Sequence, residues 1–538
     1  MTLLTIENLK LEIAGIPILT DIDLTVEAGK IVGVIGESGS GKSMTALSVM
    51  QLLPGAATVS GSIRLDGNEL IGQSERTLNA IRGRDIGMVF QEPMTALNPL
   101  MTIGDQVAET LRLRGVSKAE AEARADETLT RVGLPADRFP RGRYPHELSG
   151  GQRQRVVIAM AIALKPRLLI ADEPTTALDV TTQARIVDLL KRLVSEDGMG
   201  MIFITHDLGL VAGLADDIAI MRRGEIVESG ETAHVFATLS HPYSRALLAA
   251  SSHQPVRQPP EPAAGTVLSV QDVVRDYPLA RKSLFAPRQA FRAVNGVSLS
   301  IARGENVGLV GESGCGKSTL ARAILGLEPV QGGAIAIDGS VVDREKGPDF
   351  ATRRKIQAVF QDPYGSFNPR HRVGRLVSEP FHLLGNAAPH GPERDRRVVK
   401  ALEEVGLTAE DADKYIHEFS GGQRQRIAIA RALIIEPALI VLDEAVSALD
   451  VSIRAQILDL LADLSDRLHL SFLFISHDLT VVRSITDRVL VMKAGEIVES
   501  GETEAVFSNP QHPYTQALIA ATPVAPAIVP LPTRPDRG

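Results

Sequence analysis

The chain has 538 residues, of which 44% are hydrophobic and 23% charged, and its formal net charge is −8. This length requires more than one hydrophobic core, and the composition is that of a globular protein. The acidic balance argues against a broadly basic, nucleic-acid-binding surface, and the single cysteine, Cys315, excludes a disulfide framework, a four-cysteine zinc site and a cysteine-ligated iron–sulfur cluster within this sequence.

The N-terminal residues lack the basic start and long apolar run of a secretory signal. No uncharged apolar stretch approaches the roughly 18 residues that a membrane-spanning helix needs. Any association with a membrane is therefore expected to come through a partner.

The first motif in chain order follows an apolar run at 31–35, which is predicted to form a buried strand. It has the pattern Gly-x-x-x-x-Gly-Lys-Ser, whose backbone N–H groups surround phosphates while the lysine reaches the β- and γ-phosphates and the serine hydroxyl binds Mg²⁺. The alternative is a glycine-rich turn before a helix. The predicted nucleotide-binding residues are Gly36, Glu37, Ser38, Gly39, Ser40, Gly41, Lys42 and Ser43.

Two further motifs follow in the same half. Ser149, Gly150, Gly151 and Gln152 open a predicted helix, whose first amides provide a second site for an anion. The apolar run 168–171 leads to Asp172 and Glu173, which suit a metal-binding aspartate and a general base that polarises water.

His206 follows another apolar run, 201–204. A histidine in this position is commonly a simple cap.

All of these motifs return in the second half, so the chain is a tandem repeat of two homologous domains. The interval between copies is the same from Asp172 to Asp443 and from His206 to His477. The copies of the remaining motif residues are Gly311, Glu312, Ser313, Gly314, Cys315, Gly316, Lys317, Ser318, Ser420, Gly421, Gly422, Gln423 and Glu444. His-Pro-Tyr also ends both halves, at 241–243 and 512–514.

The apolar runs alternate with longer helical patterns, which predicts an α/β fold with a mainly parallel sheet in each domain. A proline-rich segment separates the halves and another ends the chain. The predicted division is a first domain at 1–250, a linker at 251–266, a second domain at 267–522 and an unstructured tail at 523–538.

The Ser-Gly-Gly-Gln motif, lying between the phosphate loop and the acidic strand, resembles the signature of the ATP-binding subunits of ABC transporters. The resemblance implies two P-loop domains, each with a helical subdomain carrying the signature, that pair intramolecularly and bind two ATP molecules with Mg²⁺. Each signature would complete the site of the other domain: Ser420–Gln423 with Lys42, and Ser149–Gln152 with Lys317.

The same resemblance assigns further roles. Mg²⁺ would be bound by Ser43, Gln91 and Asp172, and in the second half by Ser318, Gln361 and Asp443. Glu173 and Glu444 would be the general bases, and His206 and His477 would contact the γ-phosphate. Tyr277 would stack on adenine. The segments Ala177–Asp179 and Ala448–Asp450 would connect the two domains.

Two departures from the family pattern distinguish the halves. The first half offers only Ile13 where the second has Tyr277, which would weaken adenine binding at one site. Ala445 and Val446 follow Glu444 where Pro174 and Thr175 follow Glu173, so the backbone after Glu444 is expected to differ. Because the chemical groups occur in both halves, two hydrolytic sites are predicted.

The stretches 90–99 and 360–369 and the His-Pro-Tyr endings are similar to the dipeptide/oligopeptide importer subfamily, including fused subunits for microcin C-like peptides or glutathione. This implies an ATPase that drives solute import through two integral-membrane permease subunits, indirectly served by an extracytoplasmic solute-binding protein. It would lie peripherally on the cytoplasmic face of the bacterial inner membrane, without nucleic acid. The alternatives are a soluble ABC ATPase of DNA repair or translation, and a regulatory ATP-binding module.

Overall fold

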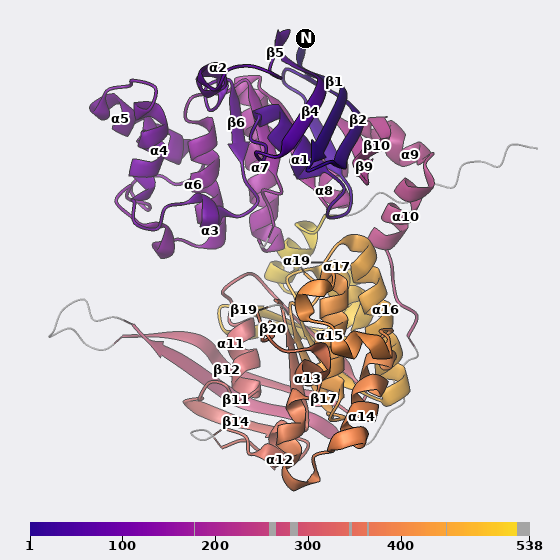
Figure 1. Cartoon of the computed structure of the whole chain (residues 1–538). Helices are drawn as coiled ribbons and strands as arrows, with labels where there is room; N and C mark the ends of the chain where they lie inside the picture. Colours follow the sequence, from indigo (N-terminus) through magenta and orange to yellow (C-terminus); the bar gives the residue numbers. More distant parts are fainter. Residues whose placement is uncertain are drawn as a thin grey trace, which may run out of the picture.

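The computed structural model describes residues 1–176, 178–257, 265–279, 289–343, 347–362, 365–447 and 449–523. Two α/β units of the same architecture lie against each other (Figure 1). Residues 258–264 of the expected linker and residues 524–538 of the expected tail lie outside the described residues. The boundaries at 250, 266 and 522 therefore stay predictions.

Each unit contains a six-stranded core sheet with the same strand order. In the first it runs β6 (Ile86–Val89), β7 (Leu168–Asp172), β8 (Gly200–Thr205), β3 (Ile31–Ile35), β9 (Asp217–Arg222) and β10 (Glu225–Glu231). In the second it runs β16 (Ile356–Phe360), β17 (Leu439–Asp443), β18 (Ser471–Ile475), β13 (Asn306–Val310), β19 (Arg488–Lys493) and β20 (Glu496–Glu502). Only the last strand of each is antiparallel to its neighbour, so the predicted mainly parallel sheet is confirmed.

An antiparallel sheet covers one face of each core sheet. In the first unit its order is β2 (Ile16–Glu27), β1 (Thr2–Ile13), β4 (Ala57–Leu65) and β5 (Asn68–Glu69). In the second it is β12 (Ala290–Ala302), β11 (Thr266–Pro278), β14 (Gly332–Ile337) and β15 (Ser340–Val341).

Helices complete the two units. The first has α1 (Lys42–Met50), α2 (Glu75–Ile81), α3 (Pro93–Ala96), α4 (Ile103–Arg112), α5 (Lys118–Arg131), η1 (Pro145–Glu147), α6 (Gly150–Ile162), α7 (Val180–Asp197), α8 (Leu208–Leu214), α9 (Thr232–Thr238) and α10 (Pro242–Ser251). The second has α11 (Lys317–Ile324), α12 (Phe350–Arg353), α13 (Val373–Val377), η2 (Glu379–Ala387), α14 (Gly391–Glu404), η3 (Ala409–Asp413), η4 (Ile416–Glu418), α15 (Gly421–Leu433), α16 (Val451–Leu468), α17 (Leu479–Ile485), α18 (Thr503–Ser508) and α19 (Pro513–Ala520).

The central strands β3, β7 and β8 are buried along their whole length and mostly apolar, because both of their faces are covered. Along β3, Val32 and Val34 pack under the antiparallel sheet, whereas Ile31 and Ile35 pack against the helical side. This alternation follows from side chains pointing to opposite faces of a strand. The strands therefore form a rigid support whose carboxyl ends carry the motif residues.

The two units face each other in opposite directions. In Figure 1, α4 and α5 of the first unit lie on the left, whereas α13 and α14 of the second lie on the right; β1 and β2 lie opposite to β11 and β12. Val180, which begins α7, packs into a core cluster of the second unit, and Val451, which begins α16, packs into one of the first. The interface is therefore reciprocal.

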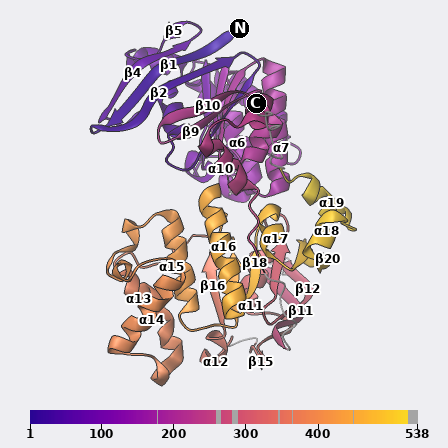
Figure 2. The same cartoon turned by 90° about the vertical axis from the view of Figure 1, so that its right-hand side faces the viewer.

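The chain leaving α10 follows the second unit, and Figure 2 shows α10 beside α16. His253 Nε2 lies 2.6 Å from Asp459 Oδ1. The Arg257 guanidinium donates to Ile485 O at 3.0 Å and to Asp487 Oδ1 at 2.9 Å. Asp487 in turn accepts from the backbone N–H of Asn306, the first residue of β13. Residues 253–257 thus anchor the first unit to the strand that leads into the second phosphate loop.

Candidate functional site: two phosphate loops at the domain interface

Each phosphate loop connects the central core strand to a helix. Gly36 has a φ of 155°, and a Cβ there would lie 2.3 Å from Met221 O. Gly41 has a φ of 104° and precedes α1. Only glycine adopts these conformations without distortion, which explains why the motif has glycine at both positions.

The loop lysines lie inside the loops. Lys42 Nζ donates to Gly36 O and Glu37 O at 2.8 and 2.9 Å, and Lys317 Nζ donates to Gly311 O and Glu312 O at 2.7 and 2.9 Å. Burial lowers the pKa of Lys42. Nearby carboxylates, of which Glu173 has the largest effect, partly offset this lowering. Cys315 is buried, and its thiol lies 3.8 Å from Lys317 Nζ.

The predicted metal-binding pairs adjoin in both halves. Ser43 Oγ donates to Asp172 Oδ1 at 3.1 Å, and Ser318 Oγ donates to Asp443 Oδ1 at 3.4 Å. Burial raises the pKa of both aspartates. Among the described residues, no group of three or more His, Cys, Asp or Glu side chains is arranged to hold a metal ion.

The first predicted general base is held on three sides. Glu173 accepts from Gln91 Nε2 and from Thr176 Oγ1, each at 2.9 Å, and its other oxygen lies 3.4 Å from His206 Nδ1. Burial alone would raise the pKa of Glu173, but His206, Thr176 and Lys42 together lower it below the ordinary value. The carboxylate is therefore ionised at neutral pH.

The second predicted base has fewer partners. The Glu444 carboxylate lies 3.1 Å from His477 Nδ1, and in the described part of the chain no bond joins it to Gln361. Its pKa is also lowered: burial would raise it, but His477 and Lys317 prevail. The expectation that the backbone differs after Glu444 is wrong. After each glutamate the chain makes the same turn, in which the Thr176 N–H bonds to Glu173 O and the Ser447 N–H to Glu444 O, both at 3.2 Å. The two glutamates themselves have similar φ values, 47° and 52°.

The signature motifs begin helices α6 and α15. Ser149 Oγ accepts from the Gln152 N–H at 3.4 Å, and Gln152 Oε1 accepts from the Ser149 N–H at 3.0 Å. Ser420 and Gln423 repeat both bonds. Ser149, Gly150, Ser420 and Gly421 are exposed, so the helix N-termini are open to a ligand.

The phosphate loops contact the opposite domain. The Ser38 N–H donates to Asp450 Oδ1 at 2.7 Å, and the Ser313 N–H donates to Asp179 Oδ2 at 3.4 Å. The predicted connecting role of these two aspartates is confirmed. Ala177 and Ala448, predicted with them, lie outside the described residues.

A second pair of contacts crosses the interface in the same places. Ser452 Oγ donates to Glu37 Oε1 at 2.5 Å, and Thr181 Oγ1 donates to Glu312 Oε1 at 2.6 Å. The sequence analysis did not predict either of these hydroxyls as part of the interface. The pattern that could have indicated them is that both α7 and α16 have a hydroxyl residue at their second position.

Tyr277 lies on β11, and its hydroxyl donates to Glu328 beyond the end of α11. The Arg275 guanidinium covers its ring at 4.5 Å. One ring face is thus occupied by this chain, and stacking on adenine stays a prediction for the other. Ile13, its counterpart, ends β1 and is half-buried.

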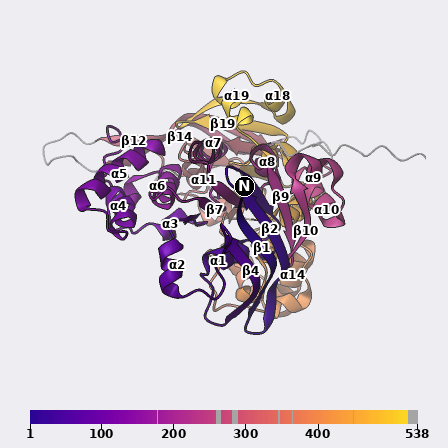
Figure 3. The ribbon, with the colours of Figure 1, turned by 90° about the horizontal axis from the view of Figure 1, so that it is seen from above.

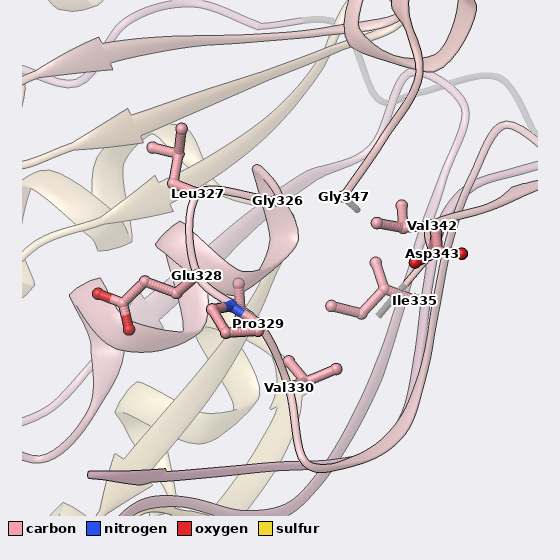
Figure 4. A pocket seen from close by; sticks show the side chains of 10 residues that line it. Gly326, Leu327, Glu328, Pro329, Val330, Ile335, Val342, Asp343 and Gly347 are labelled. Atoms are coloured by element: carbon pink, nitrogen blue, oxygen red, sulfur yellow. The ribbon is translucent and has the colours of Figure 1, made fainter. Parts of the chain in front are cut away.

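A cavity of about 120 Å³ lies elsewhere, beyond the C-terminal end of α11 (Figure 4). Glu328 and Pro329 line it from one side, and Ile335 and Val342 from the other. None of the predicted site residues lines this cavity.

Viewed from above, the two units are stacked, with the helices α4–α6 and α14 on opposite sides (Figure 3). A membrane-spanning helix, sufficiently long and apolar, does not occur among the residues with described placement. Two P-loop units in contact through their loops define a paired nucleotide-binding ATPase.

Comparisons with known proteins identify its class. The ABC transporter family matches residues 19–176 and 294–447, and the oligopeptide/dipeptide transporter C-terminal region matches 227–275 and 498–535. This chain belongs to the ABC transporter family, and it is an ABC-type ATPase.

Its relatives include glutathione import ATP-binding proteins. Those of Escherichia coli and Shigella sonnei are 46% identical over 97% of this chain and 90% of theirs. That of Salmonella paratyphi A is 47% identical over 94% of this chain and 86% of its own. Among solved structures, cbiO1 of Clostridium perfringens, part of an ABC transporter complex, aligns at 31% identity over 45% of this chain and 91% of its own, with a TM-score of 0.39.

Proposed function

We propose that this chain is the ATP-hydrolysing subunit of an importer for peptides or related small solutes, and that it acts on two separate membrane permease subunits. The main support for this proposal is that each half contains both the ATPase motifs and an oligopeptide/dipeptide transporter C-terminal region. The identity with glutathione import ATP-binding proteins over nearly the whole chain supports the same reading.

At each site the loop amides and lysine bind the ATP phosphates. Ser43 and Asp172, with Gln91, would hold Mg²⁺, and Ser318, Asp443 and Gln361 would do so in the second half. The adjoining hydroxyl and carboxylate oxygens suit this ion, which takes its other ligands from water and phosphates. When bound, Mg²⁺ neutralises charge on the phosphates.

Glu173 and Glu444 accept a proton from the attacking water, and His206 and His477 orient them and contact the γ-phosphate. The exposed signature of the opposite domain completes each site. The opposed orientation of the units and the crossing contacts at Ser38 and Ser313 support this sharing. Since neither domain alone surrounds the γ-phosphate, hydrolysis requires the two to close.

The position in the cell follows from the partners. The chain would lie on the cytoplasmic face of the inner membrane against the permeases, and a solute-binding protein would deliver the cargo outside. We do not favour a soluble ATPase of repair or translation, because both transporter C-terminal regions are present.

The first test is steady-state ATPase activity of the wild type, Glu173→Gln, Glu444→Gln and the double variant. Loss of a general base costs about 10²–10⁴-fold at its own site. Since the sites close together, each single variant should lose at least about tenfold in total activity. Near-normal turnover of Glu444→Gln would refute two competent sites.

The second test measures uptake of radiolabelled glutathione and dipeptides by cells that express this chain with its permeases. The wild type should restore uptake and the double Glu→Gln variant should not. ATPase activity stimulated by nucleic acid or ribosomes, without restored uptake, would contradict the importer assignment.

A further inference from the structure

The His-Pro-Tyr motifs have a distinct part for each residue. His241 Nδ1 accepts from the Tyr243 N–H at 3.1 Å and so caps α10, and Pro242 takes the first helical position, where no N–H is needed. His512, Pro513 and Tyr514 repeat this arrangement at α19. A cap and a proline fix where the helix begins, which leaves the tyrosine side chain in a defined direction.

Each tyrosine side chain points to the phosphate loop of its own domain. The Tyr243 hydroxyl accepts from the Glu37 N–H at 3.2 Å, and the Tyr514 hydroxyl accepts from the Glu312 N–H at 2.9 Å. Both tyrosines are buried, and a cation covers each ring at 4.9 Å: Arg222 in the first half and Lys493 in the second. The contact is thus built twice with the same chemistry.

The loop residue that each tyrosine holds is also held by the other domain. The Glu37 carboxylate accepts from Ser452, and the next N–H, of Ser38, donates to Asp450. Glu312 and Ser313 have the matching contacts with Thr181 and Asp179. Residues 37–38 and 312–313 therefore lie between the C-terminal region of their own domain and the opposite domain.

We propose that Tyr243 and Tyr514 are positioning residues for nucleotide binding: their hydroxyls fix the entrance of each phosphate loop and connect it to the C-terminal region. This rests on the proposed role of loops 36–43 and 311–318 as ATP sites. A loop fixed before binding loses less conformational freedom when nucleotide binds. Without the hydroxyl, the Glu37 or Glu312 amide loses this partner. The lysine still holds the carbonyls of the loop from inside, but the bond that ties the loop entrance to the C-terminal region is gone.

The experiment is titration of the full chain with Mg-ADP by calorimetry, for the wild type, Tyr243→Phe, Tyr514→Phe and the double variant. Phenylalanine keeps the packed ring and removes one hydrogen bond, worth about threefold to tenfold in affinity. Each single variant should weaken one of the two sites by that factor and leave the other unchanged, and the double variant should weaken both. In ATPase assays, KM should rise more than kcat falls.

Ser251→Ala and Thr522→Ala are the matched controls. Within the described part of the chain, those hydroxyls bond only to carbonyls of their own helical segments, Leu248 O and Leu518 O. They should leave both ADP affinities unchanged. Wild-type affinity in both tyrosine variants would overturn the proposal, as would equal weakening of both sites in a single variant. If the wild type itself bound no ADP, the proposed ATP sites would fail instead.

Discussion

The second signature glycine offers a sharp test of how the signature helix is held. A Cβ at Gly151 would lie 2.2 Å from Thr182 Cγ2 on α7, whereas real Cβ contacts essentially never fall below 3.0 Å. Either α6 must move from α7, or Thr182 must rotate and lose its 3.1 Å bond to Asp179 Oδ2. Such overpacking costs about 1–3 kcal/mol.

For a domain of this size, that cost corresponds to a fall of about 2–4 °C in Tm per kcal/mol. Differential scanning calorimetry of Gly151→Ala without nucleotide measures it. Gly150→Ala is the control, since its Cβ would have its nearest neighbour, Leu178 Cδ2, at 3.6 Å. That variant should retain the wild-type Tm.

Rescue makes the reasoning refutable. Thr182→Ser deletes the clashing methyl and keeps the hydroxyl, so Gly151→Ala/Thr182→Ser should regain most of the lost stability. Unchanged Tm in Gly151→Ala, or a double variant as unstable as the single, would show that close packing is not why this position is glycine. In the second half, Gly422→Ala should behave alike, because its Cβ would lie 2.4 Å from Ile453 Cγ2.

Two further predictions concern one buried and one partly buried carboxylate, Asp172 and Asp487. Burial raises the pKa of Asp172 above its ordinary value. The unfavourable free energy of keeping it ionised in the folded chain therefore develops as pH rises from the unfolded pKa through the raised folded pKa, and is complete at neutral pH. Asp172→Asn without Mg²⁺ or nucleotide should thus raise Tm at pH 7 and leave it unchanged or lower at pH 3, while abolishing ATPase activity; an unchanged or lower Tm at pH 7 contradicts this. Burial likewise raises the pKa of Asp487, whose partner Arg257 has a side chain only 11% exposed. Arg257→Ala should lower the free energy of unfolding of the second domain by about 1–3 kcal/mol, measured by urea unfolding. The control Arg396→Ala breaks an exposed ion pair and should have almost no effect. Equal effects of the two substitutions would count against the anchoring role of residues 253–257.

Local patterns predicted the framework of the sites well. The apolar run 31–35 coincides with β3, and the runs 168–171 and 201–204 lie within β7 and β8. Continuous apolar runs identify parallel strands because both faces are buried, and motif residues follow at their carboxyl ends. The adjacency of Ser43 and Asp172 follows from the same topology.

Contacts between distant parts of the chain could not be predicted in this way. Ser38 and Asp450 are in contact because the two domains pack with opposed orientations. No local sequence pattern around either residue indicates that they lie close together. The tyrosine of His-Pro-Tyr was visible as a repeat, but its bond to the phosphate loop depends on where α10 and α19 dock. The repeat indicated that the tyrosine is important in both halves, but it did not indicate which part of the chain the tyrosine contacts.

Around Glu173 and Glu444 the difference between the two sites lies in side chains, although the residues after Glu444 suggested a difference in the backbone. After each proposed general base the chain makes the same turn, with N–H to C=O bonds of 3.2 Å from Thr176 to Glu173 and from Ser447 to Glu444. Thr176 gives its hydroxyl to the Glu173 carboxylate, whereas Ser447 gives its hydroxyl to the Glu444 backbone. Glu173 is thus oriented by hydroxyl, amide and imidazole, and Glu444 by imidazole alone within the described residues. Since a general base acts through its direction as well as its charge, two sites with the same chemical groups need not turn over at the same rate.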